Sequence, residues 1–168
     1  MGGSENVCRA KCPLPLRKPP ASDDSIAGGG AVQVLAAASG FGMEELRRIL
    51  AHSRWTLREA ATLAAARTLL AEQPAVVLIC EALLPDGNWK HLLDYALRFP
   101  SPPPLIVVAR QADDYLWMEV LNRGGYNLLA IPLDERELFR VVSMAWLNLR
   151  DRSQRSQSAA AFRKTSSA

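Results

Sequence analysis

The fold of this chain is decided by the stretch VVLICEALLPDG, residues 76–87. Its first five residues form a short apolar run between turn-forming residues, which predicts a buried strand. The strand runs directly into the acid Glu81, and a Pro85-Asp86-Gly87 turn follows four residues later. The stretch therefore predicts a carboxylate at the carboxyl end of a buried strand, beside a loop.

On both sides of this stretch, short apolar runs alternate with amphipathic segments, which is typical of βα units around a parallel sheet. The pattern predicts strands at Val32–Ala37, Trp55–Arg58, Val76–Cys80, Leu105–Ala109 and Asn127–Ile131, and helices at about Met43–His52, Leu63–Glu72, Trp89–Phe99, Asp113–Arg123 and Asp134–Arg150. Strict alternation of this kind predicts an α/β fold with a doubly wound five-stranded parallel sheet of flavodoxin-like order 2-1-3-4-5. Such a sheet has a crevice at the carboxyl ends of strands one and three.

The two ends of the chain differ in composition from its middle. Residues 1–30 are rich in Pro and Gly, and residues 151–168 are rich in Ser, Arg and Gln, so both are expected to be disordered arms around one domain at 31–150. Residues 31–149 carry 11 basic and 13 acidic side chains, whereas residues 150–168 carry 5 and 1. The high isoelectric point therefore belongs to the arms and indicates little about the domain.

The bulk properties favour a cytoplasmic protein. No apolar run approaches the roughly 18–20 residues that cross a bilayer, and no signal peptide is evident. Three cysteines, Cys8, Cys12 and Cys80, cannot build a disulfide framework and are expected to be reduced thiols. The basic tail has no nucleic-acid motif and little aromatic interleaving, so we expect neither nucleic acid nor a membrane as partner.

Three segments resemble response-regulator receiver domains over residues 31–150. They are Glu81 to Pro85, the apolar run Leu105–Ala109, and the segment GYNLLAIPL, residues 125–133. The resemblance implies the fold above and a pocket built from a phosphoacceptor Asp, two acids after strand one, a hydroxyl after strand four and a Lys after strand five. In that pocket Mg²⁺ takes oxygen ligands while the Lys and hydroxyl hold the phosphoryl group.

This chain departs from the family pattern at every one of these positions. The acceptor position is Glu81, the acids fall at Ala36 and Ala37 or at Ala37 and Ala38, the hydroxyl at Ala109 and the Lys at Ile131. Alanine and isoleucine cannot bind a metal, so we expect no Mg²⁺, no cofactor and no enzymatic activity. A Glu carboxylate also reaches one methylene further, and a displacement of about 1 Å can cost 10²-fold in rate.

Other residues near the acceptor leave alternatives open. Arg110 is the first candidate to pair with Glu81 and Lys90 the second, against a simply solvated Glu81. Asp86 could reach the mouth of the crevice and serve, like Glu81, as a phosphoacceptor. The Gly/Ser segment 39–42 could expose backbone amides to an anion or nucleotide bound at the carboxyl ends of strands one and three.

The resemblance also implies a protein-binding face on the fourth and fifth helices. Its expected members are Trp117, Val120, Arg123, Arg140 and Trp146. Arg136 and Arg140 are spaced to meet acids of the fourth helix such as Asp113, Asp114 or Glu119, although ordinary packing against the sheet is an alternative for this face.

We therefore interpret the chain as a stand-alone, degenerate receiver of two-component signalling. It would act by protein contact, independently of phosphorylation, with a sensor histidine kinase or an output protein as partner, or as a homodimer. The alternatives are an anion- or nucleotide-sensing module and a phosphorylatable receiver.

Overall fold

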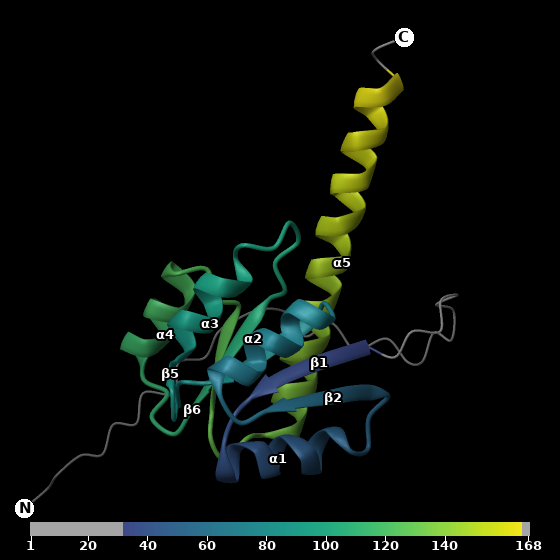
Figure 1. Cartoon of the computed structure of the whole chain (residues 1–168). Helices are drawn as coiled ribbons and strands as arrows, with labels where there is room; N and C mark the ends of the chain where they lie inside the picture. Colours follow the sequence, from purple (N-terminus) through teal and green to yellow (C-terminus); the bar gives the residue numbers. More distant parts are fainter. Residues whose placement is uncertain (1–31, 166–168) are drawn as a thin grey trace, which may run out of the picture. The chain divides into compact units, whose positions relative to one another are not determined.

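The computed structural model describes residues 32–165, with side chains as far as Ser156. The arm predicted at residues 1–30, with Cys8 and Cys12, lies outside the described residues. In chain order the elements are β1 (Val32–Ala37), α1 (Gly40–Leu50), β2 (Trp55–Ala60), α2 (Leu63–Glu72), β3 (Val77–Glu81), β4 (Leu83–Leu84), β5 (Gly87–Asn88), α3 (Trp89–Ala96), β6 (Leu105–Ala109), α4 (Asp114–Asn122), β7 (Asn127–Ala130) and α5 (Glu135–Thr165). Figure 1 shows their arrangement.

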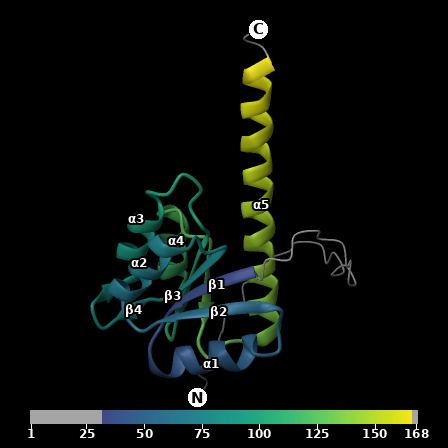
Figure 2. The same ribbon diagram turned by 45° about the vertical axis from the view of Figure 1, so that its right-hand side comes forward.

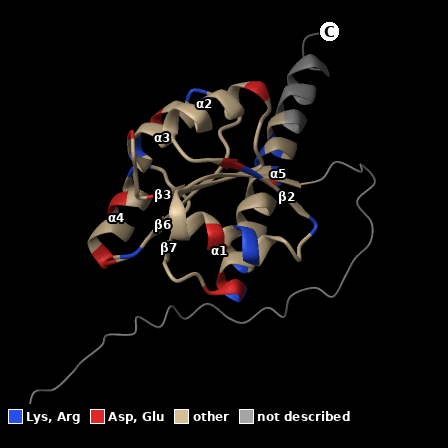
Figure 3. Cartoon of the chain, turned by 60° about the horizontal axis from the view of Figure 1, so that its bottom comes forward, with Lys and Arg blue, Asp and Glu red and all other residues tan. Residues whose placement is uncertain are grey.

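Five parallel strands form one sheet in the order β2-β1-β3-β6-β7, which confirms the predicted doubly wound topology. The helices cover both faces, as Figures 1 and 2 show: α1 and α5 lie on one face, and α2, α3 and α4 lie on the other. β4 and β5 add a two-stranded antiparallel hairpin between β3 and α3, where the sequence predicted only a turn. The acidic and basic residues, coloured red and blue in Figure 3, lie mainly on the helices and loops.

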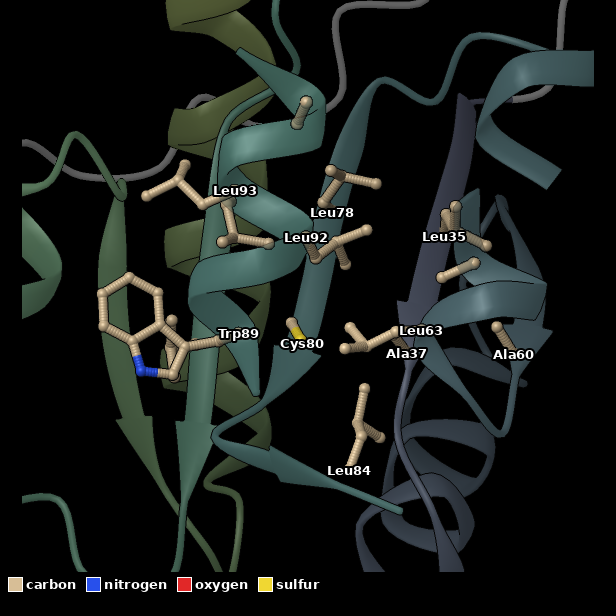
Figure 4. Packing of buried hydrophobic residues seen from close by; sticks show 14 of the residues in the cluster. Leu35, Ala37, Ala60, Leu63, Leu78, Cys80, Leu84, Trp89, Leu92 and Leu93 are labelled. Atoms are coloured by element: carbon tan, nitrogen blue, oxygen red, sulfur yellow. The ribbon is translucent and has the colours of Figure 1, made fainter. Parts of the chain in front are cut away.

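The buried strands follow from their sequences. β3 and β6 are almost continuous runs of Val, Leu, Ile and Ala, and a strand covered by helices on both faces needs apolar side chains in both directions. One side of β3 sends Leu78 and Cys80 into the layer beneath α2 and α3 (Figure 4), while Val77 and Ile79 enter the layer beneath α1 and α5. The two hydrophobic layers fix the sheet between the helices and so fix where its strand ends lie.

The ends of α4 and the start of α5 follow capping rules. Asp113 precedes α4 and its carboxylate accepts the Leu116 amide at 2.8 Å, and Asp134 accepts the Glu137 amide in the same way before α5. After α4, Gly124 takes φ +94°, as expected of a glycine that ends a helix. α1 begins at Gly40, one turn before the predicted start at Met43, so the Gly/Ser segment is the first turn of a helix.

α5 departs from the prediction. The sequence predicts an end near Arg150 and a disordered tail from residue 151, but the helix continues to Thr165 and extends past the sheet (Figures 1 and 2). Arg, Gln and Ala are favourable helix residues, and neither Gly nor Pro occurs between Arg150 and Thr165. Helix propensity therefore explains why residues 151–165 are helical although their polar composition had indicated disorder.

Candidate functional site

The strand register brings the sequence-predicted pocket positions to one edge of the sheet. Ala37, the last residue of β1, is paired with Cys80, and Glu81 follows Cys80 at the end of β3. Ala109 ends β6 and is paired with Ala130 of β7, which Ile131 follows. Because the carboxyl ends of parallel strands share an edge, the structure places Ala37, Glu81, Ala109 and Ile131 at the same edge of the sheet.

Glu81 is engaged by the loop that follows β1. Its Oε2 accepts a hydrogen bond from the Ser39 amide at 3.0 Å, and the Ser39 hydroxyl lies 3.4 Å from the same oxygen. A methyl group placed at Gly42 would lie 3.6 Å from Glu81 Oε2 and 3.5 Å from Ile131 Cδ1. The first turn of α1 therefore closes over the carboxylate and the Ile131 side chain together.

The hydrogen-bond partner of Glu81 is Ser39, and neither of the two predicted cations. Among the residues that the structure describes, neither Arg110 nor Lys90 forms an ion pair with Glu81. Lys90 instead pairs with Glu119 of α4, Nζ to Oε1, at 2.5 Å. A Glu side chain that is one methylene longer than Asp reaches the backbone of the facing loop, so its partner is an amide and not a cation.

The residues present do not fit the magnesium site that the resemblance implies. Ala37 and Ala38 occupy the positions of the two acids and are 0 % and 1 % exposed, while Ala109 and Ile131 are buried at the hydroxyl and Lys positions. Mg²⁺ needs oxygen ligands in octahedral geometry, which methyl groups cannot supply. In the described part of the chain, no group of three or more His, Cys, Asp or Glu side chains is placed to hold a metal ion.

A second acid at this edge makes a contact that the sequence did not predict. Glu45, one turn into α1, is 9 % exposed, and its Oε2 accepts the Leu133 amide at 2.8 Å. Leu133 follows the cis Ile131–Pro132 peptide bond, in the turn between β7 and α5. The bond joins residues 88 positions apart, so no local pattern could indicate it. Glu45 thus connects α1 to the loop where the family has its Lys-Pro pair.

Asp86 does not reach the crevice. Its two carboxylate oxygens accept the amides of Leu63 and Ala64, at 2.7 and 2.9 Å, at the start of α2. These backbone hydrogen bonds lower the pKa of the Asp86 carboxyl below its ordinary value. The prediction that Asp86 serves at the pocket mouth is therefore wrong, because its carboxylate stabilises the first turn of α2.

A groove of about 710 Å³ lies beside the acceptor position, between α3, α4 and the β4–β5 hairpin. Its walls are formed by Glu81, Ala82, Leu83, Asn88, Trp89, Lys90, Ala109, Arg110, Gln111, Leu116 and Glu119. Arg110 and Lys90 thus lie near Glu81, as predicted, although their side chains line this groove. It opens at the carboxyl ends of β3 and β6, whereas the sequence predicted a crevice at strands one and three.

The predicted protein-binding face is only partly exposed. Val120 is 0 % exposed because it lies one turn after Leu116 on the side of α4 that packs on the sheet, so its assignment to the face is wrong. Trp117 is 46 % exposed, whereas Trp146 is half-buried against the sheet. Further exposed apolar residues that the prediction missed are Tyr115, Met118 and Leu121 on α4 and Met144 and Leu147 on α5.

The charged side chains of this face form ion pairs with residues of their own helix or of α3. Arg140 lies 3.8 Å from Glu137 of the same helix, and Arg123 lies 3.5 Å from Glu119, which also holds Lys90. Within the described residues no ion pair connects α4 to α5, which contradicts the expected pairing of Arg136 or Arg140 with acids of α4. The lowered pKa of Glu119 has the hydrogen bond from Lys90 as its main cause. The cations of the face are therefore locally neutralised.

Comparison with known proteins identifies the fold. A signal receiver domain of an HD domain-containing protein from Pseudomonas fluorescens has a TM-score of 0.67 at 24% identity, over 77% of this chain and 98% of that one. The signal receiver domain of a histidine kinase from Syntrophus aciditrophicus has a TM-score of 0.61 at 18% identity (70% and 92% covered). The chemotaxis response regulator CheY4 of Vibrio cholerae has a TM-score of 0.61 at 15% identity (69% and 99% covered). No protein-family model and no curated protein sequence matches the chain.

The chain thus has the fold of response-regulator receiver domains, as the sequence predicted, and spans nearly the whole length of the three neighbours. None of the helices that the structure describes combines the length and the apolar character of a membrane span.

Proposed function

We propose that this chain is a receiver-like module of two-component signalling that acts through protein–protein contact, independently of phosphorylation. One observation carries the proposal: the carboxylate at the acceptor position accepts hydrogen bonds from Ser39, in the loop that would otherwise supply metal ligands. A carboxylate that attacks phosphorus needs a cation to neutralise the developing charge. Here Oε2 of Glu81 accepts hydrogen bonds from Ser39, and the apolar neighbours Ala37 and Ala38 supply no ligand for such a cation.

The remaining pocket positions support the same proposal. Ala109 and Ile131 have no side-chain donor, so the positions where the family has its hydroxyl and its Lys would offer a phosphoryl group no hydrogen bond. We propose accordingly that the module needs no Mg²⁺ or other cofactor and has no enzymatic activity. Its output would come from a surface whose shape is held constant by the Glu81–Ser39 and Glu45–Leu133 contacts.

The exposed apolar residues of α4 and α5 are the surface that fits a protein partner. A kinase, an output protein or a second copy of the chain would all bury Trp117, Met118 and Met144, which now face solvent. Exposed apolar residues grouped on neighbouring elements are typical of interaction sites. The cytoplasmic location stays a prediction of the sequence.

The phosphorylation test uses the full chain with Mg²⁺ and a small-molecule phosphodonor such as acetyl phosphate, followed by intact-mass measurement. We expect no added phosphoryl group in the wild-type chain, in Glu81→Asp or in Asp86→Asn. The Glu81→Asp variant is the informative control, because it restores the acceptor residue while leaving Ala37, Ala38, Ala109 and Ile131 unchanged. Stoichiometric phosphorylation of the wild-type chain that Glu81→Gln abolishes would overturn the proposal.

The contact test places a photo-crosslinking amino acid at Met118 in cells, with the same amino acid at Arg48 on α1 as the matched exposed control. We expect a discrete adduct from position 118 that forms equally with and without the phosphodonor. Equal labelling at both positions, or an adduct that needs the donor, would contradict the proposed mode of action.

A further inference from the structure

The groove beside Glu81 is lined by charged side chains that are not part of the proposed protein-binding surface on α4 and α5. Four charged side chains line it: Glu81, Lys90, Arg110 and Glu119. Three of them are already engaged, since Lys90 and Glu119 form an ion pair and Glu81 accepts hydrogen bonds from Ser39. Arg110 is exposed and, among the described residues, forms no ion pair. The groove therefore offers one unneutralised guanidinium.

The rest of the lining is largely apolar. Leu83, on the β4–β5 hairpin, is 75 % exposed, and Leu116 of α4 and Ala82 are partly buried. Trp89 forms a buried wall; its side chain lies near β6 in Figure 4, and Lys90 Nζ lies 5.8 Å from its ring centre. Gln111 and Asn88 add amide groups at the rim. A volume of about 710 Å³ falls within the range of small-molecule sites, roughly 300–1,000 Å³.

We propose that this groove binds a small organic anion, with its carboxylate held by Arg110 and its aromatic or aliphatic body packed against Leu83 and Leu116. A guanidinium binds a carboxylate through two parallel hydrogen bonds, which fixes both position and orientation. A cation is disfavoured because both carboxylates of the groove already have donors. The groove touches the acceptor position, α3 and α4 at once, so an occupant would contact both helices that the Lys90–Glu119 pair joins.

The test titrates the full chain, labelled with ¹⁵N, with 2-naphthoate and with its neutral analogue 2-naphthamide. We expect naphthoate to shift the backbone amides of Ala82, Asn88, Arg110 and Gln111 in a saturable way. The amide analogue has the same body without the charge and should bind about tenfold more weakly, as expected when a charge-assisted hydrogen bond is lost.

Two variants and one control locate the site. Arg110→Gln should weaken naphthoate binding about tenfold, while Arg48→Gln, which removes an exposed arginine on α1, should leave it unchanged. Glu119→Gln releases Lys90 and should tighten binding severalfold, because it adds a second free cation to the groove. The dispersion of each spectrum shows whether the variant is folded.

Three results would overturn the proposal. One is the absence of saturable shifts at millimolar naphthoate. Another is equal affinity of the acid and the amide, or of the wild-type chain and a folded Arg110→Gln variant. The third is a set of shifts confined to Trp117 and Met118, which would place the probe on the exposed surface of α4 and leave the groove empty.

Discussion

The carboxylate of Glu45 and the backbone amide of Leu133 form a buried hydrogen bond of 2.8 Å. The bond connects α1, which covers one face of the sheet, to the turn between β7, the last strand of the sheet, and α5. Leu133 is itself 6 % exposed, so water cannot replace the lost acceptor if Glu45 is removed. This contact therefore holds the β7–α5 loop in the position where it shapes the edge of the pocket.

Replacing Glu45 by Ala should lower the free energy of unfolding by about 1–3 kcal/mol, the usual cost of a buried amide left without an acceptor. Glu45→Gln keeps a carbonyl oxygen at the same reach and should lose less. Urea unfolding followed by circular dichroism measures both, with Glu44→Ala as the exposed control on the same turn. Equal stability of the Glu45 and Glu44 variants would show that the bond contributes nothing.

Asp86 should contribute a pH-dependent part of the stability. The amides of Leu63 and Ala64 hold the pKa of its carboxyl below the ordinary value of 3.8, so the folded state binds this proton less readily than the unfolded chain. Its contribution is therefore complete above that value and is lost as pH falls below 3.8 through the lower folded-state pKa. We expect Asp86→Ala to lower the Tm by about 5 °C at neutral pH, and by less at acid pH. A difference that stays constant from pH 7 to strongly acid conditions would contradict the assigned role.

Gly125 should not tolerate a side chain. A Cβ at this position would lie 2.6 Å from Val120 Cγ1 and 2.9 Å from the Val120 carbonyl oxygen, which already accepts the Gly125 amide. Gly125→Ala should therefore destabilise the chain by about 1–3 kcal/mol, since the backbone after α4 must move. Thermal unfolding beside the exposed Asn122→Ala control measures the effect, and wild-type stability of Gly125→Ala would refute it.

Cys80 should be unreactive in the folded chain. It is 0 % exposed in the layer beneath α2 and α3 (Figure 4), and burial, with the nearby Glu81 and Asp86 charges, raises the pKa of its thiol to about 12. The thiolate is the nucleophile, so alkylation requires unfolding. In a Cys8→Ser/Cys12→Ser chain, we expect labelling by iodoacetamide only in denaturant. Rapid labelling in native buffer would mean that this layer opens readily.

The sequence predicted the sheet well because its signals are local. Apolar periodicity, with Pro74 after α2 and Pro104 before β6, gave these two elements the same ends that the structure shows, and the strand order follows from the alternation of elements. The strands and their order needed only spacing and periodicity, whereas the pocket positions were placed by the resemblance to receiver domains.

The partners of the charged groups could not be predicted in the same way. Glu81 to Ser39, Glu45 to Leu133 and Asp86 to Leu63 all join a side chain to a distant backbone amide, and periodicity carries no information about such pairs. From the sequence, a residue of opposite charge was expected beside Glu81, and Arg110 was the first candidate. In the structure these carboxylates instead accept backbone amides at helix starts and in turns. The end of α5 was missed for a different reason, because polar composition was given more weight than helix propensity.

The length of α5 has a geometric consequence. Its last fifteen residues, Asp151–Thr165, continue the same helix beyond the part that packs on the sheet and form a rod about 22 Å long. Such a rod is a lever whose pivot lies near Leu149, a partly buried residue that is followed by the exposed Arg150, Asp151 and Arg152. A tilt of about 5° at the pivot would carry the far end roughly 2 Å sideways, given that length. Small adjustments of packing under α5 would thus displace the end of the helix far enough to change its contacts with a neighbouring molecule.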